Sequence, residues 1–379
     1  MNFKVFILAV SALCIGLVEL IVGGILPIIA NDLHVSIGVA GQLITVYAIV
    51  YAISGPVLLT VTAKTERKKL YLLSLAVFLI GNICTYFSSS FMFIMAARIV
   101  TAMSASLVIV LSLTIAAKIV RPEHRAKAIG YIYMGVSSSL VLGIPIGIVI
   151  TNLFSWRTVF LGIGLLSILS FLLIYFYLEE IPATGSRSLK EQIRALKNKK
   201  LLLTHIATMF YLAGHYTVYA YFTPFLQETM NVSTYMISIC YFLFGISAVA
   251  GGAIGGYLTD WLGVKKAIYF VLASFTIVLA LLPYSTISFA LFIIVLLIWG
   301  ALSWGLAPSQ QEYIIQTDKE TSDLHQSLNN SSIQVGIALG SGIGGVAITQ
   351  VGTITQIPLI GAIIMIFALL SAWFSFRLR

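Results

Sequence analysis

Twelve long apolar segments follow one another along this chain of 379 residues, and they constrain its fold more than any other feature. A helix needs about 20 mostly apolar residues to cross the hydrocarbon core of a bilayer. Only 9% of the residues are charged, whereas a soluble domain carries about 25%. We therefore predict an all-α membrane protein with twelve transmembrane helices. The predicted spans are about 5–28, 37–60, 70–88, 92–117, 127–150, 158–178, 201–226, 234–258, 267–284, 287–307, 327–349 and 356–375.

The basic residues are distributed unequally between the two sides of this arrangement. With twelve spans, the two termini and every connection from an even to an odd span lie on one face. All of the 22 Lys and Arg residues except Arg98 and Arg157 fall on that face. Cytoplasmic loops are enriched in Lys and Arg, so both termini are predicted to be cytoplasmic. The formal net charge of +9 thus reflects topology and does not indicate a nucleic-acid partner.

The two halves of the sequence are related at one fixed offset. Shifting the chain by 197 residues aligns Pro27 with Pro224, Gly55 with Gly252, Gly143 with Gly340, and Gly147 with Gly344. We predict two pseudo-symmetric six-helix bundles, residues 1–178 and 201–379, joined by a charged cytoplasmic linker at 179–200. A parallel repeat of this kind puts a transport pathway at the interface of the halves, near the bilayer midplane.

One acid and one base stand out because they lie inside apolar spans. Glu19 is the acidic residue that sits well within a predicted span, and Arg98 is the matching base in span 92–117. Ionisable groups inside a membrane are costly and by default mark function. We prefer a role for Glu19 in binding and releasing a proton beside Arg98, over a static ion pair that only joins two spans. Such a role needs the cation to move relative to the carboxyl, because a nearby cation lowers a carboxyl pKa and burial raises it.

Polar side chains in three other spans are candidates for a substrate cavity. Span 201–226 holds three of them, near the point that corresponds to Glu19 in the other half, and aromatic faces there suit a flat heterocycle. Amides in lipid need partners, so they face a cavity or another helix. The candidates are Gln42, Tyr47, His215, Tyr216, Tyr219, Asn330 and Gln334. The competing interpretation is interfacial tyrosines and contacts between helices. We expect His205 to be interfacial, and two histidines ten residues apart do not indicate a metal site.

A specific motif follows span 234–258. It reads Gly256-Tyr-Leu-Thr-Asp260-Trp-Leu-Gly263-Val-Lys265-Lys266. This resembles the loop signature of the major facilitator superfamily, whose members gate transport there, so the resemblance implies the same for these residues. The related loop at Ala63 to Lys69 is a degenerate copy, with alanine at the acidic position and Glu66 at the glycine position.

Further matches cover essentially the whole chain. Arg98 resembles the family's span-4 arginine, and Gly143-Ile-Pro145-Ile-Gly147 resembles the motif of its antiporters. Within the superfamily, the chain is similar to drug:proton antiporters, and most similar to bacterial purine base and nucleoside efflux permeases. The stretches from Val18 to Pro27 and from Ala213 to Phe222 carry that likeness.

The resemblance implies a proton-coupled exporter of the bacterial inner membrane, working by alternating access. The expected partners are protons, lipid and a small planar polar solute, with purine bases or nucleosides first, and the chain is expected to be a monomer. Efflux of sugars or of amphipathic drugs such as chloramphenicol is the second reading, and uptake is the third. We expect no cofactor. Since no G-x-x-x-x-G-K-[ST] phosphate loop occurs, we do not expect ATP to energise the protein directly. We expect neither an enzyme nor a channel, because the spans hold neither a nucleophile with its base nor a ring of charges.

Overall fold

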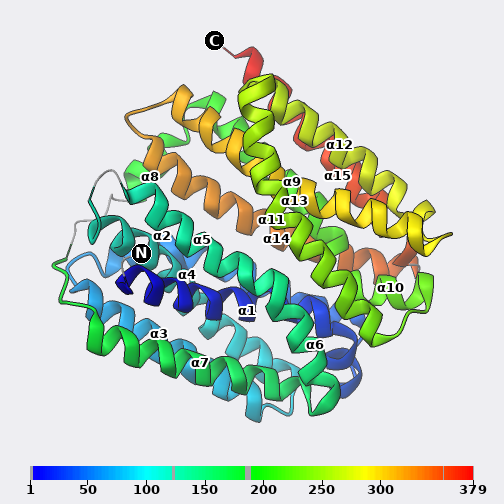
Figure 1. Ribbon diagram of the computed structural model, residues 1–379, viewed down its shortest axis with the longest axis horizontal. Helices are drawn as coiled ribbons and strands as arrows, with labels where there is room; N and C mark the ends of the chain where they lie inside the picture. Colours follow the sequence, from blue (N-terminus) through cyan, green and yellow to red (C-terminus); the bar gives the residue numbers. More distant parts are fainter. Residues whose placement is uncertain (1–2, 122–123, 184–188, 353, 379) are drawn as a thin grey trace. The chain divides into compact units, whose positions relative to one another are not determined.

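Every element in the described part of the chain is a helix (Figure 1). The computed structural model describes residues 3–121, 124–183, 189–352 and 354–378. In the first half of the chain the helices are α1 (Phe3–Asp32), α2 (Ile37–Val61), α3 (Arg67–Phe87), α4 (Phe91–Lys118), α5 (Arg125–Ser138), the π-helical turn η2 (Ser139–Gly143), α6 (Ile144–Leu153) and α7 (Trp156–Tyr177). In the second half they are α8 (Leu189–Ala195), α9 (Lys199–Tyr219), α10 (Phe222–Met230), α11 (Thr234–Leu262), α12 (Val264–Ser285), α13 (Phe289–Thr317), α14 (Ser322–Val351), the 3₁₀ turn η3 (Ile354–Gln356) and α15 (Ile357–Arg377).

Eleven stretches of helix in the described residues are long and apolar enough to cross a membrane. They correspond to eleven of the twelve predicted spans. The remaining prediction, one continuous span over 201–226, is wrong in detail, because α9 ends at Tyr219 and α10 begins at Phe222. The span predicted at 127–150 is found as the continuous stretch Lys127–Leu153, which contains the π-helical turn η2.

Two polar connections also differ from prediction. The predicted connection over 308–326 is mostly helical, since α13 continues to Thr317 and α14 begins at Ser322. Part of the predicted linker, 184–188 with Arg187, lies outside the described residues. The remainder of the linker contains the short helix α8.

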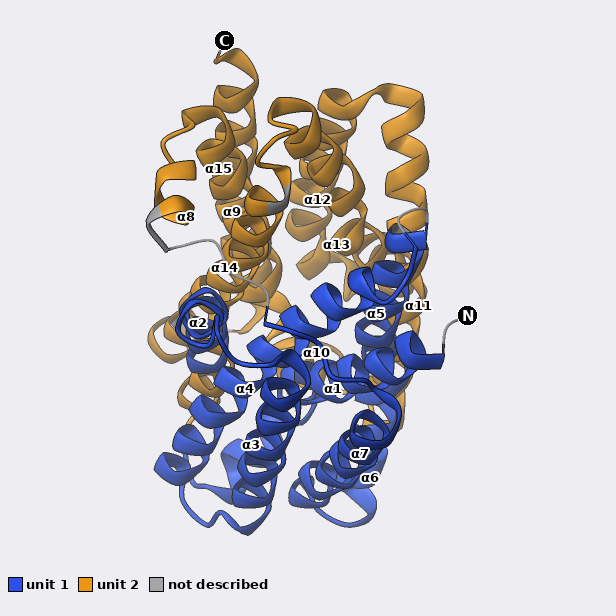
Figure 2. Cartoon of the chain, turned by 90° about the vertical axis from the view of Figure 1, so that its left-hand side faces the viewer, with its two compact units in different colours: residues 1–35, 46–189 blue, residues 36–45, 190–379 orange. Residues whose placement is uncertain are grey.

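The chain divides into two compact units (Figure 2). Unit 1 comprises residues 1–35 and 46–189, and unit 2 comprises residues 36–45 and 190–379. In unit 1, α1 packs against α4, α5, α6 and α7, and α3 packs between α4 and α7. In unit 2, α9 packs against α14 and α15, α11 packs against α13, and α12 packs against α13 and α15. The predicted bundle boundaries at residues 178 and 201 stay a prediction.

The repeat is visible in the backbone as well as in the sequence. His34 and Asn231, which are 197 residues apart, are the two non-glycine residues with positive φ in the described chain, at 53° and 49°. Each is followed by a serine that caps the next helix: Ser36 accepts a hydrogen bond from the Val39 N–H, and Ser233 accepts one from Met236, both at 3.3 Å. Equivalent turns therefore begin the second helix of each half.

Close helix packing in unit 2 depends on two glycines of α11. A Cβ atom on Gly251 or Gly255 would overlap the backbone of Ala301 or Gly305 in α13, whereas one on Gly252 would meet nothing within 4 Å. The two glycines one turn apart let the backbones of α11 and α13 approach directly, as small residues do in membrane bundles.

Candidate functional site

The buried arginine of α4 lies beside the acid-bearing turn of α1, within unit 1. Arg98 is 1% exposed, and its Nη1 donates to the backbone carbonyl of Val18 at 2.8 Å. That carbonyl belongs to the residue before Glu19, which is itself half-buried, and the charge of Glu19 acts on Arg98. The structure thus brings together the acid and base that the sequence singled out.

Tyr47 of α2 completes this cluster. The guanidinium carbon of Arg98 lies 4.1 Å from the centre of the Tyr47 ring, a cation–π arrangement that compensates a buried cation for lost water. The Tyr47 side chain is 1% exposed, and its hydroxyl has no hydrogen-bond partner among the described residues. A buried donor without a partner is costly. The hydroxyl is therefore a candidate contact for a bound solute.

The glycine-proline motif of η2 and α6 packs against the face of α1 opposite Glu19. Pro145 has no N–H and stands just after η2, a kind of turn that often occurs at functional positions. A Cβ on Gly143 would overlap the Leu17 side chain, and one on Gly147 would overlap Ile21. Leu17 and Ile21 lie two residues on either side of Glu19, about 200° around the helix. The motif therefore supports α1 from behind the acid.

His215 of α9, in the predicted span 201–226, lies in an aromatic cluster of unit 2. His215 is 5% exposed, and its Nδ1 accepts a hydrogen bond from the Trp299 indole N–H at 3.1 Å. The Phe244 ring stacks on it with centroids 6.0 Å apart and planes 5° apart, and the Tyr219 ring lies 5.1 Å away. Trp299 was not predicted as a site residue, although a tryptophan at the centre of an apolar span signals a buried N–H that needs an acceptor.

The two neighbouring tyrosines differ in their surroundings. Tyr219 is 3% exposed, and its hydroxyl has no hydrogen-bond partner in the described part of the chain. Tyr216 is half-buried, with its ring 5.2 Å from His215 and 5.4 Å from Tyr219. The predicted group His215, Tyr216 and Tyr219 is thus one contiguous set of rings.

The predicted amides lie elsewhere in unit 2. Gln42 is half-buried and lies against Gly345 of α14, Asn330 is half-buried, and Gln334 is buried. The neighbouring Asn329 was not predicted as a site residue. Its side-chain oxygen accepts a hydrogen bond from the Thr208 hydroxyl at 2.7 Å, the kind of partner that an amide in an apolar surrounding needs.

A second amide was missed because its helix was predicted to end before it. Gln310, in the part of α13 predicted as a loop, is 3% exposed. It donates to the Thr204 carbonyl at 2.9 Å and to the Thr208 hydroxyl at 2.6 Å.

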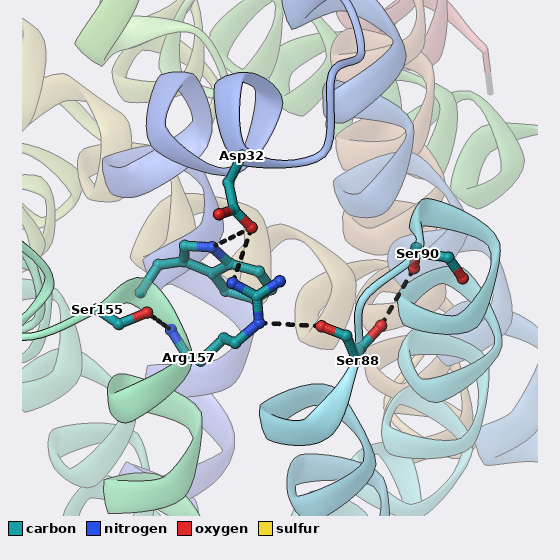
Figure 3. Close-up of polar contacts among 6 residues, drawn as sticks. Asp32, Ser88, Ser90, Ser155 and Arg157 are labelled. Atoms are coloured by element: carbon teal, nitrogen blue, oxygen red, sulfur yellow. Dashed lines mark hydrogen bonds and ion pairs between the residues drawn. The ribbon is translucent and has the colours of Figure 1, made fainter.

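The basic residue Arg157, one of the two exceptions to the charge distribution, forms an ion pair (Figure 3). Its Nη1 lies 2.7 Å from a carboxylate oxygen of Asp32, at the end of α1, and its Nε donates to the Ser88 carbonyl at 2.9 Å. The same Asp32 oxygen accepts from the Trp156 indole N–H at 3.2 Å. The guanidinium therefore ties α1, α7 and the α3–α4 connection together, with its charge neutralised.

The loop between α11 and α12 shows why its glycine is required. Gly263 has φ +80° and caps α12 without a side chain, a conformation that favours glycine. Asp260, Lys265 and Lys266 are exposed around it, and a Cβ on Gly256 would meet nothing within 4 Å. Whether these residues gate transport stays a prediction.

The degenerate loop of the first half has its own structural solution. Glu66 has φ −57°, so no glycine is needed. Its carboxylate accepts the backbone N–H groups of Lys68, Lys69 and Ile181, each at 2.7 Å. Burial alone would raise the pKa of Glu66, but these three hydrogen bonds lower it below the ordinary value. The carboxylate caps α3 and holds the beginning of the 179–200 segment.

Comparison with known proteins identifies the family. A sequence model of the protein family described as Major Facilitator Superfamily matches residues 8–318. The chain belongs to the major facilitator superfamily. It is 34% identical over 369 residues to the uncharacterized MFS-type transporter YbcL of Bacillus subtilis strain 168, covering 97% of this chain and 95% of that one. A probable sugar efflux transporter of Mannheimia succiniciproducens is 26% identical over 362 residues, covering 96% and 91%.

Solved structures share the fold of this superfamily member. An inward-facing, unoccupied bacterial homologue of the human lysosomal transporter Spinster has a TM-score of 0.81 at 15% identity, covering 99% of this chain and 97% of that one. The nucleoside transporter NupG has a TM-score of 0.75 at 15% identity, covering 99% of both chains. The protein is thus an all-α, multi-pass transporter of this superfamily, and the predicted fold class is confirmed. Among its described residues, no group of three or more His, Cys, Asp and Glu is placed to hold a metal ion.

Proposed function

We propose that this transporter is a proton-coupled antiporter of the bacterial inner membrane that exports small planar polar solutes by alternating access. Purine bases or nucleosides are the leading substrates. In this proposal both termini are cytoplasmic, the first half couples transport to protons, and the second contributes much of the substrate wall.

The observation that carries the proton coupling is the cluster of Glu19, Arg98 and Tyr47 in unit 1. A carboxyl inside a membrane helix is stabilised in its charged form by the neighbouring guanidinium and in its neutral form by burial. Arg98 is held by a backbone carbonyl and an aromatic ring as well as by the charge of Glu19. The base therefore has other partners when the acid is protonated, so Glu19 can take and release a proton without leaving a bare buried cation.

The substrate class is supported by the aromatic surroundings and by two buried hydroxyls. Tyr47 and Tyr219 each bury a hydroxyl that no described residue satisfies, and each belongs to a group of rings. Flat heterocycles with polar edges stack on rings and accept or donate at such hydroxyls. NupG is named as a nucleoside transporter, and it shares this fold.

Sugar efflux is the second candidate, because two relatives carry that description. The proteins of Mannheimia succiniciproducens and Helicobacter pylori, 26% and 25% identical, are each named as a probable sugar efflux transporter. A pentose or hexose would bind through hydrogen bonds and gain less from aromatic rings.

The test of coupling uses proteoliposomes with an imposed pH gradient. We expect Glu19→Gln to abolish gradient-driven transport while leaving substrate exchange at equal pH, because the amide mimics the protonated acid. Glu228→Gln is the matched control, since Glu228 is exposed at the end of α10. Undiminished gradient-driven efflux by Glu19→Gln would show that Glu19 does not couple transport to protons.

The test of substrate class is counterflow in the same proteoliposomes. The panel contains radiolabelled purine bases, nucleosides, pentoses, hexoses and chloramphenicol. We expect saturable counterflow with purine bases or nucleosides. If no purine base or nucleoside gave counterflow and a sugar did, the second candidate would be established. The coupling test would not be affected by that result.

A further inference from the structure

Two histidines far apart in the sequence meet inside unit 2. The Nε2 atom of His205 in α9 lies 3.1 Å from the Nδ1 atom of His325 in α14, and the rings stack with planes 18° apart. Their side chains are 3% and 1% exposed. The expectation that His205 is merely interfacial is therefore wrong, because α14 begins earlier than predicted and brings His325 against it.

This contact requires a shared proton. Two ring nitrogens at hydrogen-bond distance need one N–H between them, since two lone pairs repel and two N–H groups collide. The neutral pair carries two protons on four nitrogens, one of them in the bridge. Whichever ring donates, one outer nitrogen is left with a bare lone pair. The outer nitrogen of His205, Nδ1, is buried and has no hydrogen-bond partner among the described residues.

Uptake of one more proton gives a single product from either tautomer. The third proton binds the bare outer nitrogen, and the bridging proton lets both rings share the positive charge. A fourth proton would destroy the bridge and set two cations with ring centres 5.4 Å apart. The pair is therefore built to accept one proton for two rings.

The surroundings are polar and carry one acid that acts on the pair. Asn329 interacts with His205 and also accepts from Thr208. Several charged and titratable residues lie at this end of unit 2, on α9, α13, the connection from α13 to α14, and α15: Lys199, Lys200, Glu312, Tyr313, Asp318, Lys319, Glu320 and Arg377. Lys200 lies over the Tyr313 ring at 5.8 Å, and Glu312 accepts from Gln316.

Asp318 links the pair to the surface. Its charge acts on His325, and hydrogen bonds from the Thr321 hydroxyl and N–H lower its own pKa, so it stays ionised. Burial opposes the charged form of the His325 imidazole, and the ionised carboxylate beside it favours that form. A metal ion is not the better occupant, because no third His, Cys, Asp or Glu joins the two rings among the described residues, and zinc takes at least three protein ligands.

We propose that the His205–His325 pair is a second proton-binding site of this transporter, loaded from the side of unit 2 where Asp318 lies. This site is separate from Glu19 in unit 1 and is not part of the proposed function. Proton binding by the histidine pair can be measured without any substrate.

The test uses the full chain, labelled with ¹⁵N-histidine and reconstituted in lipid. Nitrogen NMR is recorded from about pH 8 to about pH 4, which brackets the ordinary imidazole range. The protein has five histidines, and His205→Gln and His325→Asn assign the pair while keeping an amide where the bridging nitrogen stood. We expect both rings to change together with uptake of one proton. Independent titration of the two rings, each to a full proton, would overturn the proposal, and so would no change in either ring.

Two variants leave both rings of the pair in place, one at the half-buried Asp318 and one at the exposed His34. Asp318→Asn should weaken proton binding by the pair about three- to tenfold, because a partly screened carboxylate is lost. His34→Asn is the control, since His34 is exposed and its backbone has a positive φ of 53°. Asparagine tolerates this left-handed conformation. An unchanged titration in Asp318→Asn would remove Asp318 from the site. Failure of the Glu19 test would leave these spectra unaffected.

Discussion

Adjacent glycines of α11 offer a direct test of how unit 2 is packed. A Cβ on Gly251 would lie 2.6 Å from the Cα of Ala301, whereas ordinary contact begins at 3.4 Å. Because the nearest obstacle is the backbone carbonyl oxygen of Ala301, α11 and α13 must separate by about 1.5 Å, an overpacking that costs about 1–3 kcal/mol. Gly252→Ala meets nothing within 4 Å and gains about 0.8–1 kcal/mol from the better helix propensity of alanine.

The comparison of the two variants isolates the packing term. Both replace glycine by alanine in the same turn of the same helix, so the propensity gain cancels in their difference. The remaining difference is about 1–3 kcal/mol. At about 2–4 °C per kcal/mol for a unit of this size, the unfolding midpoint of Gly251→Ala should lie about 2–12 °C below that of Gly252→Ala.

The assay is thermal unfolding of the purified protein in detergent, followed by tryptophan fluorescence at one scan rate. Gly255→Ala should behave like Gly251→Ala, because its Cβ would meet the Gly305 backbone. The double variant of Gly251 and Gly255 should cost less than the sum, since one separation of the helices relieves both overlaps. Equal midpoints for Gly251→Ala and Gly252→Ala would refute the packing described for α11 and α13.

Three further outcomes follow from individual contacts. Arg157→Gln should destabilise unit 1 by about 2 kcal/mol, measured by detergent unfolding. This is the combined contribution of a partly exposed ion pair, a backbone hydrogen bond and the cation–π contact of Arg157 with the Trp156 ring, 4.3 Å from the ring centre. Trp299→Phe should cost about 2–4 kcal/mol, because it leaves the buried Nδ1 of His215 without a donor and removes ring volume. Adding His215→Phe should recover part of that loss. Glu66→Ala should cost about 1–2 kcal/mol and speed amide exchange at Ile181. Since the pKa of Glu66 is lowered from 4.5, its stabilisation is present above about pH 4.5 and is lost as the pH falls through the folded value.

Each of these outcomes has a result that would contradict it. An Arg157→Gln variant as stable as the parent would mean that its contacts carry no net free energy. No recovery in the double variant of Trp299 and His215 would assign the loss to ring volume alone. Faster exchange throughout α3, without a specific effect at Ile181, would show that Glu66 caps the helix but does not hold the following segment.

The sequence by itself determined eleven of the helices that are long and apolar enough to cross a membrane, and where the rare charges of the chain lie. Span number follows from the fixed thickness of the bilayer, and Glu19 and Arg98 are conspicuous because charge is costly in an apolar run. Their similar depth was also predictable, because depth along a helix is a count of residues.

Tertiary structure decided which side chains meet across helices. His215 pairs with Trp299, and His205 with His325, over separations of 84 and 120 residues. Such contacts depend on how each helix is rotated about its own axis, and neighbouring lipid and protein are equally apolar, so hydropathy carries no record of that rotation. The same rotation sets Gly251 against α13 and turns Gly252 away from it, although the two glycines are indistinguishable in the sequence.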